Sequence, residues 1–194
     1  HNMISLPPPL WRTCRILAAE TRLQLIWNIF TCGELCVTQL MELTNISRTN
    51  TSNQLRLLAE HGLIVSRREK MNVIYRAEAN TAMRFAPPLL AALKNGFNHS
   101  MSFKSIIRQA TAVSHGRRIE IIQALRGKSL SFEDLGNATG LSPAALSRHL
   151  LKLETRNFVM RNGKLYRYGK PGNTLGKVLI KLAANTCTTT VPQQ

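Results

Sequence analysis

The sequence predicts a mainly α-helical protein with small β wings, built from two tandem winged helix-turn-helix domains. In each half, a serine precedes a helix whose leucines recur at spacings of three and four, the pattern of a helix with one buried side. In each half, a short basic segment follows that has the composition of a two-stranded hairpin. The two copies align at a constant offset of 95 residues, which is the length of one small domain and not of a solenoid repeat.

The correspondence between the halves extends on both sides of these helices. NISRTNTSNQLRLLAEHGLIV aligns with GLSPAALSRHLLKLETRNFV, ETRLQLIWNIF parallels GRRIEIIQAL, and SRREKMNVIYRAE parallels MRNGKLYRYGK. The second hairpin is the shorter one. We therefore expect a first domain over residues 3–97, a second domain over residues 98–184, and a flexible tail over residues 185–194.

The first half is expected to hold five helices and one hairpin. Thr44-Asn45 forms the turn between the third and fourth helices. Pro87-Pro88 suits a helix start and not a helix interior, and Gly96 is expected to end that helix before a linker over residues 97–102. The expected helices cover residues 10–19, 21–30, 37–43, 47–60 and 87–94, and the hairpin covers residues 65–77.

The second half is expected to repeat this order. Ser142 can cap a helix N-terminus and Pro143 fits its first turn, while Gly140 ends the tight turn before it. Asn162-Gly163 marks the tip of the second hairpin. Helices are expected at residues 103–112, 115–125 and 174–184, in FEDLGNAT and in SPAALSRHLLKL.

The outward face of the fourth helix in each half is expected to enter the DNA major groove. Asn and Gln pair with adenine and Arg with guanine, while small residues let the backbone approach. The expected DNA-binding residues of the first helix are Arg48, Thr49, Asn50, Ser52, Asn53, Gln54 and Arg56, and those of the second are Ser142, Ala144, Ala145, Ser147, Arg148, His149 and Lys152. For each face, the alternative is a solvated polar helix surface.

The hairpins carry cations where a wing tip could straddle phosphates. These contacts would add affinity and salt dependence but no choice of sequence. The expected wing contacts are Arg67, Arg68 and Lys70 in the first half and Arg161 and Lys164 in the second. Ordinary solvated surface residues are the alternative.

Both halves resemble the ArsR/SmtB family of winged-helix repressors. The residues that carry the resemblance are GELCVTQL, the serine-rich helices SRTNTSNQLRLL and SPAALSRHLLKL, and EHGLIVSRREKMNVIYR with its basic wing. The resemblance spans residues 17–77 and 113–168. It implies dimeric, effector-controlled binding to operator DNA.

Three of the four cysteines lie in the first half, where the resembling metal sensors carry a Glu-Leu-Cys-Val-Cys pattern. This chain has Cys36 at the first thiol, but Thr38 stands at the second. Cys14 and Cys32 could complete a soft-metal site or a redox pair, although buried free cysteine is the more common state. The family's other metal site, which uses Asp, His and Glu on the final helices, lacks its ligands. We therefore expect no metal and no cofactor.

The net charge of +16 and an isoelectric point near 10.7 favour a polyanionic partner, either nucleic acid or an anionic membrane. No apolar run approaches the roughly 20 residues that span a bilayer, and no secretion signal is recognised. The second half carries a net charge of +11 and the first +5. No catalytic set or phosphate-binding loop is found. We expect a cytoplasmic, non-enzymatic protein that binds double-stranded DNA and no membrane.

These observations predict a sequence-specific regulator, most simply a repressor. The related one-repeat repressors pair through their first and last helices, so this chain, which holds two copies of each, is expected to form an intramolecular pseudo-dimer rather than a homodimer. Two rival functions stay open. A protein–protein scaffold would have an exposed apolar patch, and a nucleoid-type binder would bind almost entirely through electrostatics.

Overall fold

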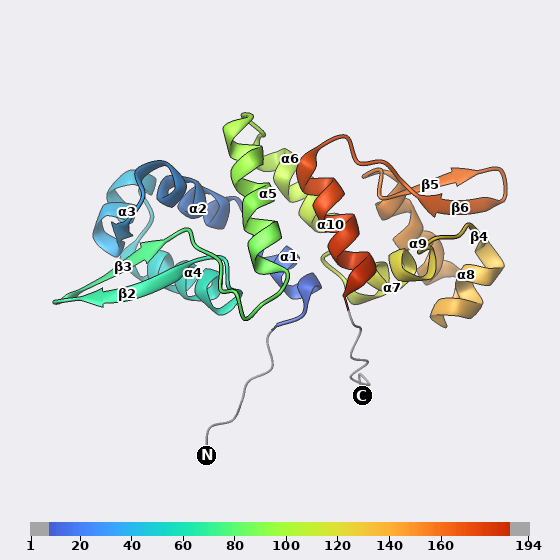
Figure 1. Cartoon of the computed structure of the whole chain (residues 1–194), viewed down its shortest axis with the longest axis horizontal. Coiled ribbons are helices and arrows are strands. Elements are labelled where there is room, and N and C mark those ends of the chain that lie inside the picture. The colour runs from blue at the N-terminus through green and yellow to red at the C-terminus, as the bar shows by residue number, and fades with distance from the viewer. Residues whose placement is uncertain (1–7, 187–194) are drawn as a thin grey trace, which may run out of the picture.

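The computed structural model describes residues 8–186, and within that range it confirms the predicted fold class. Ten helices and two three-stranded sheets form two winged helix-turn-helix units on either side of a central group of helices (Figure 1). The first unit contains α1 (Leu10–Leu17), α2 (Glu20–Cys32), β1 (Leu35–Cys36), α3 (Val37–Thr44), α4 (Arg48–Glu60), β2 (Val65–Glu69), β3 (Asn72–Arg76) and α5 (Ala86–Asn98). The second contains α6 (Phe103–Ala112), α7 (Gly116–Ala124), β4 (Leu130–Ser131), α8 (Phe132–Thr139), α9 (Pro143–Glu154), β5 (Val159–Asn162), β6 (Leu165–Tyr168) and α10 (Thr174–Asn185).

Equivalent residues begin and end the helices of the two helix-turn-helix motifs. Asn45 and Gly140 end α3 and α8 in the left-handed conformation, at φ 54° and 63°, which glycine and asparagine adopt most readily. Ser47 and Ser142 then cap α4 and α9, since each hydroxyl oxygen accepts a hydrogen bond from the amide three residues on. The predicted duplication is therefore visible in the local geometry.

Each unit closes with a small antiparallel sheet whose hairpin projects outward (Figure 1). Strand order is β1-β3-β2 in the first unit and β4-β6-β5 in the second. The first hairpin turns at Lys70-Met71, between the paired residues Glu69 and Asn72. The second turns at Gly163-Lys164, one residue beyond the predicted tip, with Gly163 at φ 60°. A two-residue turn of this kind favours glycine.

The two units join through their first and last helices. α5 packs against α10, and α1 packs against α6. Phe97 of α5 stands edge-on between Phe30 of α2 and Phe103 of α6, with ring centroids 5.8 and 6.1 Å away, a favourable aromatic geometry. Buried apolar residues of both units belong to one connected core, so the central helices are not two separate surfaces in loose contact.

Several expected boundaries are wrong. The helix expected over residues 10–19 ends at Leu17, and the helix expected over residues 21–30 runs from Glu20 to Cys32. Gly96 does not end α5, which continues to Asn98. A Cβ atom on Gly96 would stand 3.2 Å from the Met101 sulfur, so this glycine lies buried where the chain folds back over the helix. α10 includes Asn185, which was expected in the tail; residues 187–194 lie outside the described part of the chain. No helix within residues 8–186 is long and apolar enough to cross a membrane.

Candidate nucleic-acid interface

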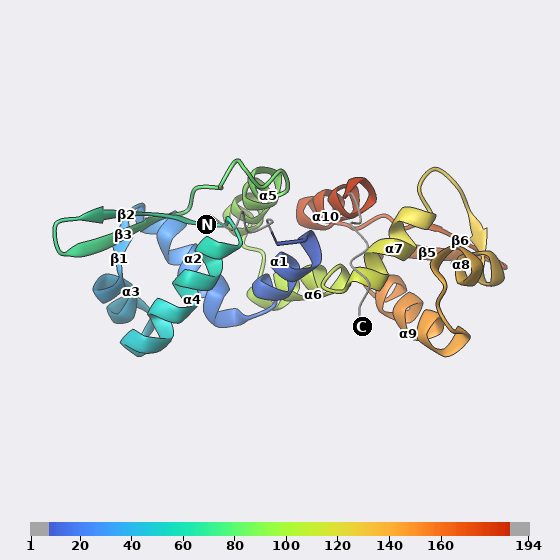
Figure 2. The ribbon, with the colours of Figure 1, turned by 90° about the horizontal axis from the view of Figure 1, so that it is seen from below.

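The two recognition helices lie along the same side of the molecule. In Figure 2, α4 and α9 occupy the lower edge, and α5 and α10 occupy the upper edge. We call α4 with the β2–β3 hairpin the first head, and α9 with the β5–β6 hairpin the second head. The two heads flank the central helices α1 and α6. A single long ligand could therefore contact both heads at once.

In the first head, the predicted inward and outward sides of α4 are correct. Thr51, Leu55 and Leu58 are fully buried. Of the expected DNA-binding residues, Ser52 and Gln54 are half-buried, and the exposed ones are Arg48, Thr49, Asn50, Asn53 and Arg56. Most of the predicted face is therefore accessible to a partner. Arg56 also forms an exposed ion pair with Glu60, at 2.9 Å.

Gln54 is positioned by Arg22, which is not among the residues that the sequence predicts to bind DNA. Its Oε1 accepts a hydrogen bond from Arg22 Nη1 at 2.7 Å, and its Nε2 donates to Asn50 Oδ1 at 2.9 Å. The guanidinium of Arg22 also donates to the carbonyl of Ile16 at the end of α1. Arg118 makes the equivalent bond to Ala112 at 2.7 Å in the second unit. The aligned segments ETRLQLI and GRRIEII both contain an arginine, and this shared residue is the sequence signal that could have identified Arg22.

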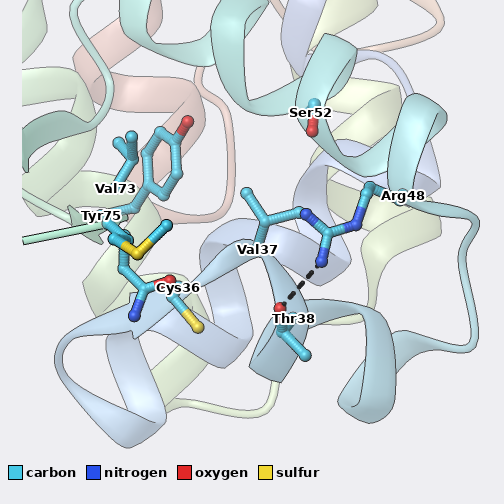
Figure 3. Close-up of a pocket in the computed structure, with 9 residues that line it drawn as sticks. Cys36, Val37, Thr38, Arg48, Ser52, Val73 and Tyr75 are labelled. Atoms are coloured by element: carbon cyan, nitrogen blue, oxygen red, sulfur yellow. Dashed lines mark hydrogen bonds between the residues drawn. The ribbon is translucent and has the colours of Figure 1, made fainter.

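Arg48 lines a hollow between α4 and the first hairpin (Figure 3). Its Nη2 donates to Thr38 Oγ1 at 3.2 Å, and no carboxylate within residues 8–186 pairs with it. The hollow measures about 250 Å³, and Ser52, Asn72 and Cys36 also line it. The Arg48 guanidinium and the hydroxyl groups at this position can donate hydrogen bonds to a phosphate oxygen. Thr38 and Asn72 therefore join the candidate interface.

In the second head, α9 buries Leu146, Leu150 and Leu153 as predicted. The expected residues Ser142, Ala144, Ser147, Arg148 and Lys152 are exposed, and Ala145 is half-buried. Within the described range, neither Arg148 nor Lys152 forms an ion pair. Their charges are therefore available to an anionic partner.

The assignment of His149 to the DNA face is wrong. Its side chain is 7% exposed and packs against His115, with ring centroids 4.8 Å apart. Burial lowers the pKa of His149 to about 4, and neighbouring His115 and Arg118 add to the effect. His149 is buried because it lies three residues after Leu146, on the core side of α9. A buried imidazole at this position is not part of the exposed face that α9 offers to DNA.

The wing cations divide into paired and unpaired residues. Arg67 bonds to Glu34 at 2.6 Å and to Glu69 at 3.3 Å. Arg161 donates to the carbonyl of Gly163 at 2.9 Å, and its guanidinium stands 5.6 Å from the centre of the Tyr166 ring. Arg68, Lys70 and Lys164 are exposed and form no ion pair among the described residues. All five side chains lie on the hairpins where they were expected.

The structure does not bring the three thiols into one site. Cys14 is fully buried in the core, Cys32 is exposed at the end of α2, and Cys36 is half-buried beside the hollow (Figure 3). Burial raises the pKa of the Cys14 thiol, which disfavours the thiolate that metals and oxidants require. Within residues 8–186, no group of three or more His, Cys, Asp or Glu side chains could hold a metal ion.

We therefore expect Cys36→Ser to fold and to bind DNA as the unmodified protein does. The serine keeps the size of the side chain, and among residues 8–186 no other cysteine forms a disulfide or a metal site with Cys36. DNA affinity measured before and after adding arsenite, cadmium or peroxide tests this. Release of the wild-type protein, but not of Cys36→Ser, would establish Cys36 as a sensor and contradict our interpretation.

Comparison with known proteins identifies the two units. Residues 19–66 and 115–160 each match the family described as bacterial regulatory protein, arsR family. These segments run from α2 to the first hairpin strand and from α7 to the equivalent strand. The chain is a tandem member of the ArsR family. It is thus a DNA-binding transcriptional regulator of a non-enzymatic family, as the sequence predicts.

One relative of this ArsR-family chain is the arsenical resistance operon repressor of Escherichia coli strain K12. The two are 40% identical over 62 residues, which cover 32% of this chain and 53% of the relative. The chain thus spans about half the length of that relative. A match of this length corresponds to less than one of the two units.

Proposed function

We propose that the chain is a sequence-specific repressor that binds one operator with its two dissimilar heads, as an intramolecular pseudo-dimer. The observation that carries this proposal is the packing of α5 on α10 and of α1 on α6. A protein made of two separate binding modules would need no such contact. The continuous core across these helices fixes the heads relative to each other, so binding of the first brings the second to the DNA without further loss of rotational freedom.

The position of the heads supports a single duplex as the ligand. Helix-turn-helix dimers read half-sites about 34 Å apart, one turn of B-DNA, in successive major grooves. α4 and α9 lie along the same edge of the molecule, on either side of α1 and α6 (Figure 2). The unpaired cations of both heads add attraction to phosphates. A regulator of this kind would act in the cytoplasm, on DNA.

Sequence choice is expected because the two helices carry different chemistry. The α4 face presents Thr49, Asn50, Asn53 and Arg56, whereas the α9 face presents Ala144, Ser147 and Arg148. Amide and guanidinium groups distinguish base edges in the major groove, which a purely electrostatic binder would not need. The operator halves should therefore differ, and the site should be an imperfect palindrome or no palindrome. The Escherichia coli relative is an operon repressor, which supports repression as the activity.

Selection of bound sequences from random duplex DNA at physiological salt tests the function. We expect two unlike half-sites, about 10 base pairs between their centres. Enrichment of a perfect palindrome would contradict the single-chain arrangement. Retention of DNA without any enriched sequence would favour a non-specific binder, and failure to retain DNA would favour a scaffold.

A further inference from the structure

An exposed leucine lies on the face of α9 that would enter the major groove. Leu151 is 61% exposed, although it belongs to the same helix as the fully buried Leu146 and Leu153. At 100° per residue, it projects from the side opposite that buried stripe. Ala144, Ser147 and Arg148 share this side, because they precede it by seven, four and three residues. Leu151 is therefore part of the candidate reading surface and not of the core.

No residue of α4 is an exposed large apolar side chain of this kind. The residue of α4 that aligns with Leu151 is Arg56, which is exposed and paired with Glu60. The aligned positions nearer the helix start differ in the same way, since Thr49 of α4 corresponds to Ala144 of α9. Along one face, α4 thus offers hydrogen-bonding groups alone, whereas α9 offers the Ser147 hydroxyl and the Arg148 guanidinium beside two apolar side chains.

The major groove displays one apolar group, the 5-methyl group of thymine. An aliphatic side chain on a recognition helix can bury that methyl group, while a charged or amide side chain in its place would lose hydration without gaining a partner. Leu151 is close enough to Arg148, one helical turn away, for both to contact neighbouring base pairs.

We propose that Leu151 is a specificity-determining residue that contacts a thymine methyl group in the half-site bound by α9. This inference rests on the proposed sequence-specific binding of DNA. It assigns different chemistry to the two half-sites. The half-site under α4 is read through hydrogen bonds, and the half-site under α9 contains a thymine beside the position that Arg148 contacts.

Uracil tests this contact because it differs from thymine only by the methyl group. In the selected duplex, each thymine is replaced in turn by uracil, and the affinities of wild-type protein and Leu151→Ala are compared. One replacement is expected to weaken wild-type binding about fourfold, the effect of one buried methyl group. Leu151→Ala should bind the thymine duplex about as weakly as the wild type binds the uracil duplex. Replacing thymine by uracil should not weaken the binding of Leu151→Ala further.

Leu43→Ala is the matched control, because Leu43 is 50% exposed on α3, outside both recognition helices. It should keep the full sensitivity of the wild type to uracil. If every thymine can be replaced without loss of wild-type affinity, or if Leu151→Ala stays as sensitive as wild type, the methyl contact is wrong while sequence-specific binding stands. If selection yields no preferred sequence, the proposed function fails and this contact with it.

Discussion

Arg148→Ala is expected to weaken binding to the selected operator by about 1–3 kcal/mol, which is the usual value of a bidentate arginine–guanine contact. The side chain is exposed on the outer face of α9, and no carboxylate among residues 8–186 competes for it. The loss of affinity should be confined to the operator duplex and should not occur with a scrambled duplex. Affinity for operator and scrambled duplexes, titrated at several salt concentrations, measures both effects.

Arg161→Ala provides the contrasting result. We propose that this wing cation contacts phosphate, so its removal should weaken binding to both duplexes alike and lower the slope of log affinity against log salt by about one. Arg84→Ala, which removes the exposed arginine in the loop before α5, should change neither quantity. Unaltered operator binding by Arg148→Ala would exclude that residue from the site.

Gly169→Ala is expected to cause the largest loss of stability. A Cβ atom there would stand 2.1 Å from the backbone oxygen of Asn157 and 2.8 Å from the carbonyl carbon of Phe158. The backbone amide of Gly169 also donates to the Phe158 carbonyl at 2.9 Å, so the second hairpin is held against the turn after α9. The strand or the turn must move, at a cost of about 3 kcal/mol or more. The thermal midpoint should fall by roughly 6–12 °C.

Gly172→Ala is the matched control for this substitution. Gly172 lies three residues further along the chain, and a Cβ atom there would meet nothing within 4 Å. Calorimetry or circular dichroism of the two variants should therefore separate steric conflict from a general effect of adding a methyl group. Equal midpoints for the two variants would show that the hairpin base tolerates a side chain.

Most of the fold could be predicted from the sequence because its signals are local. Ser47 and Ser142 cap helices through bonds to residues three positions away, and Asn45 and Gly140 end helices through their own backbone conformation. Such features depend on few residues, so they can be recognised without knowing the tertiary structure. The duplication helped, because each feature of one half could be checked in the other.

The errors concern contacts that form only in the folded chain. The position of His149 on the flank of the second recognition helix predicts a DNA contact, but the residue packs against His115, the N-cap of α7, which lies 34 residues earlier in the chain. Gly96 is a residue type that commonly ends helices, but in the structure it lies within α5 and is buried against Met101. The close approach of Gly169 to Asn157 has no local sequence signal. The bond from Arg22 to Gln54 likewise joins two helices. The repeat alignment pairs Arg22 with Arg118, but Arg118 bonds to Ala112, Thr111 and Ser114 and not to α9.

The stoichiometry of the protein–DNA complex tests the central claim most directly. Sedimentation at micromolar concentration, without DNA and with a duplex that carries both selected half-sites, gives the number of chains in each species. We predict a free mass of 21.7 kDa and a complex of one chain per duplex. A free species of twice that mass, or two chains on the duplex, would contradict the intramolecular pseudo-dimer and favour a homodimer with four heads.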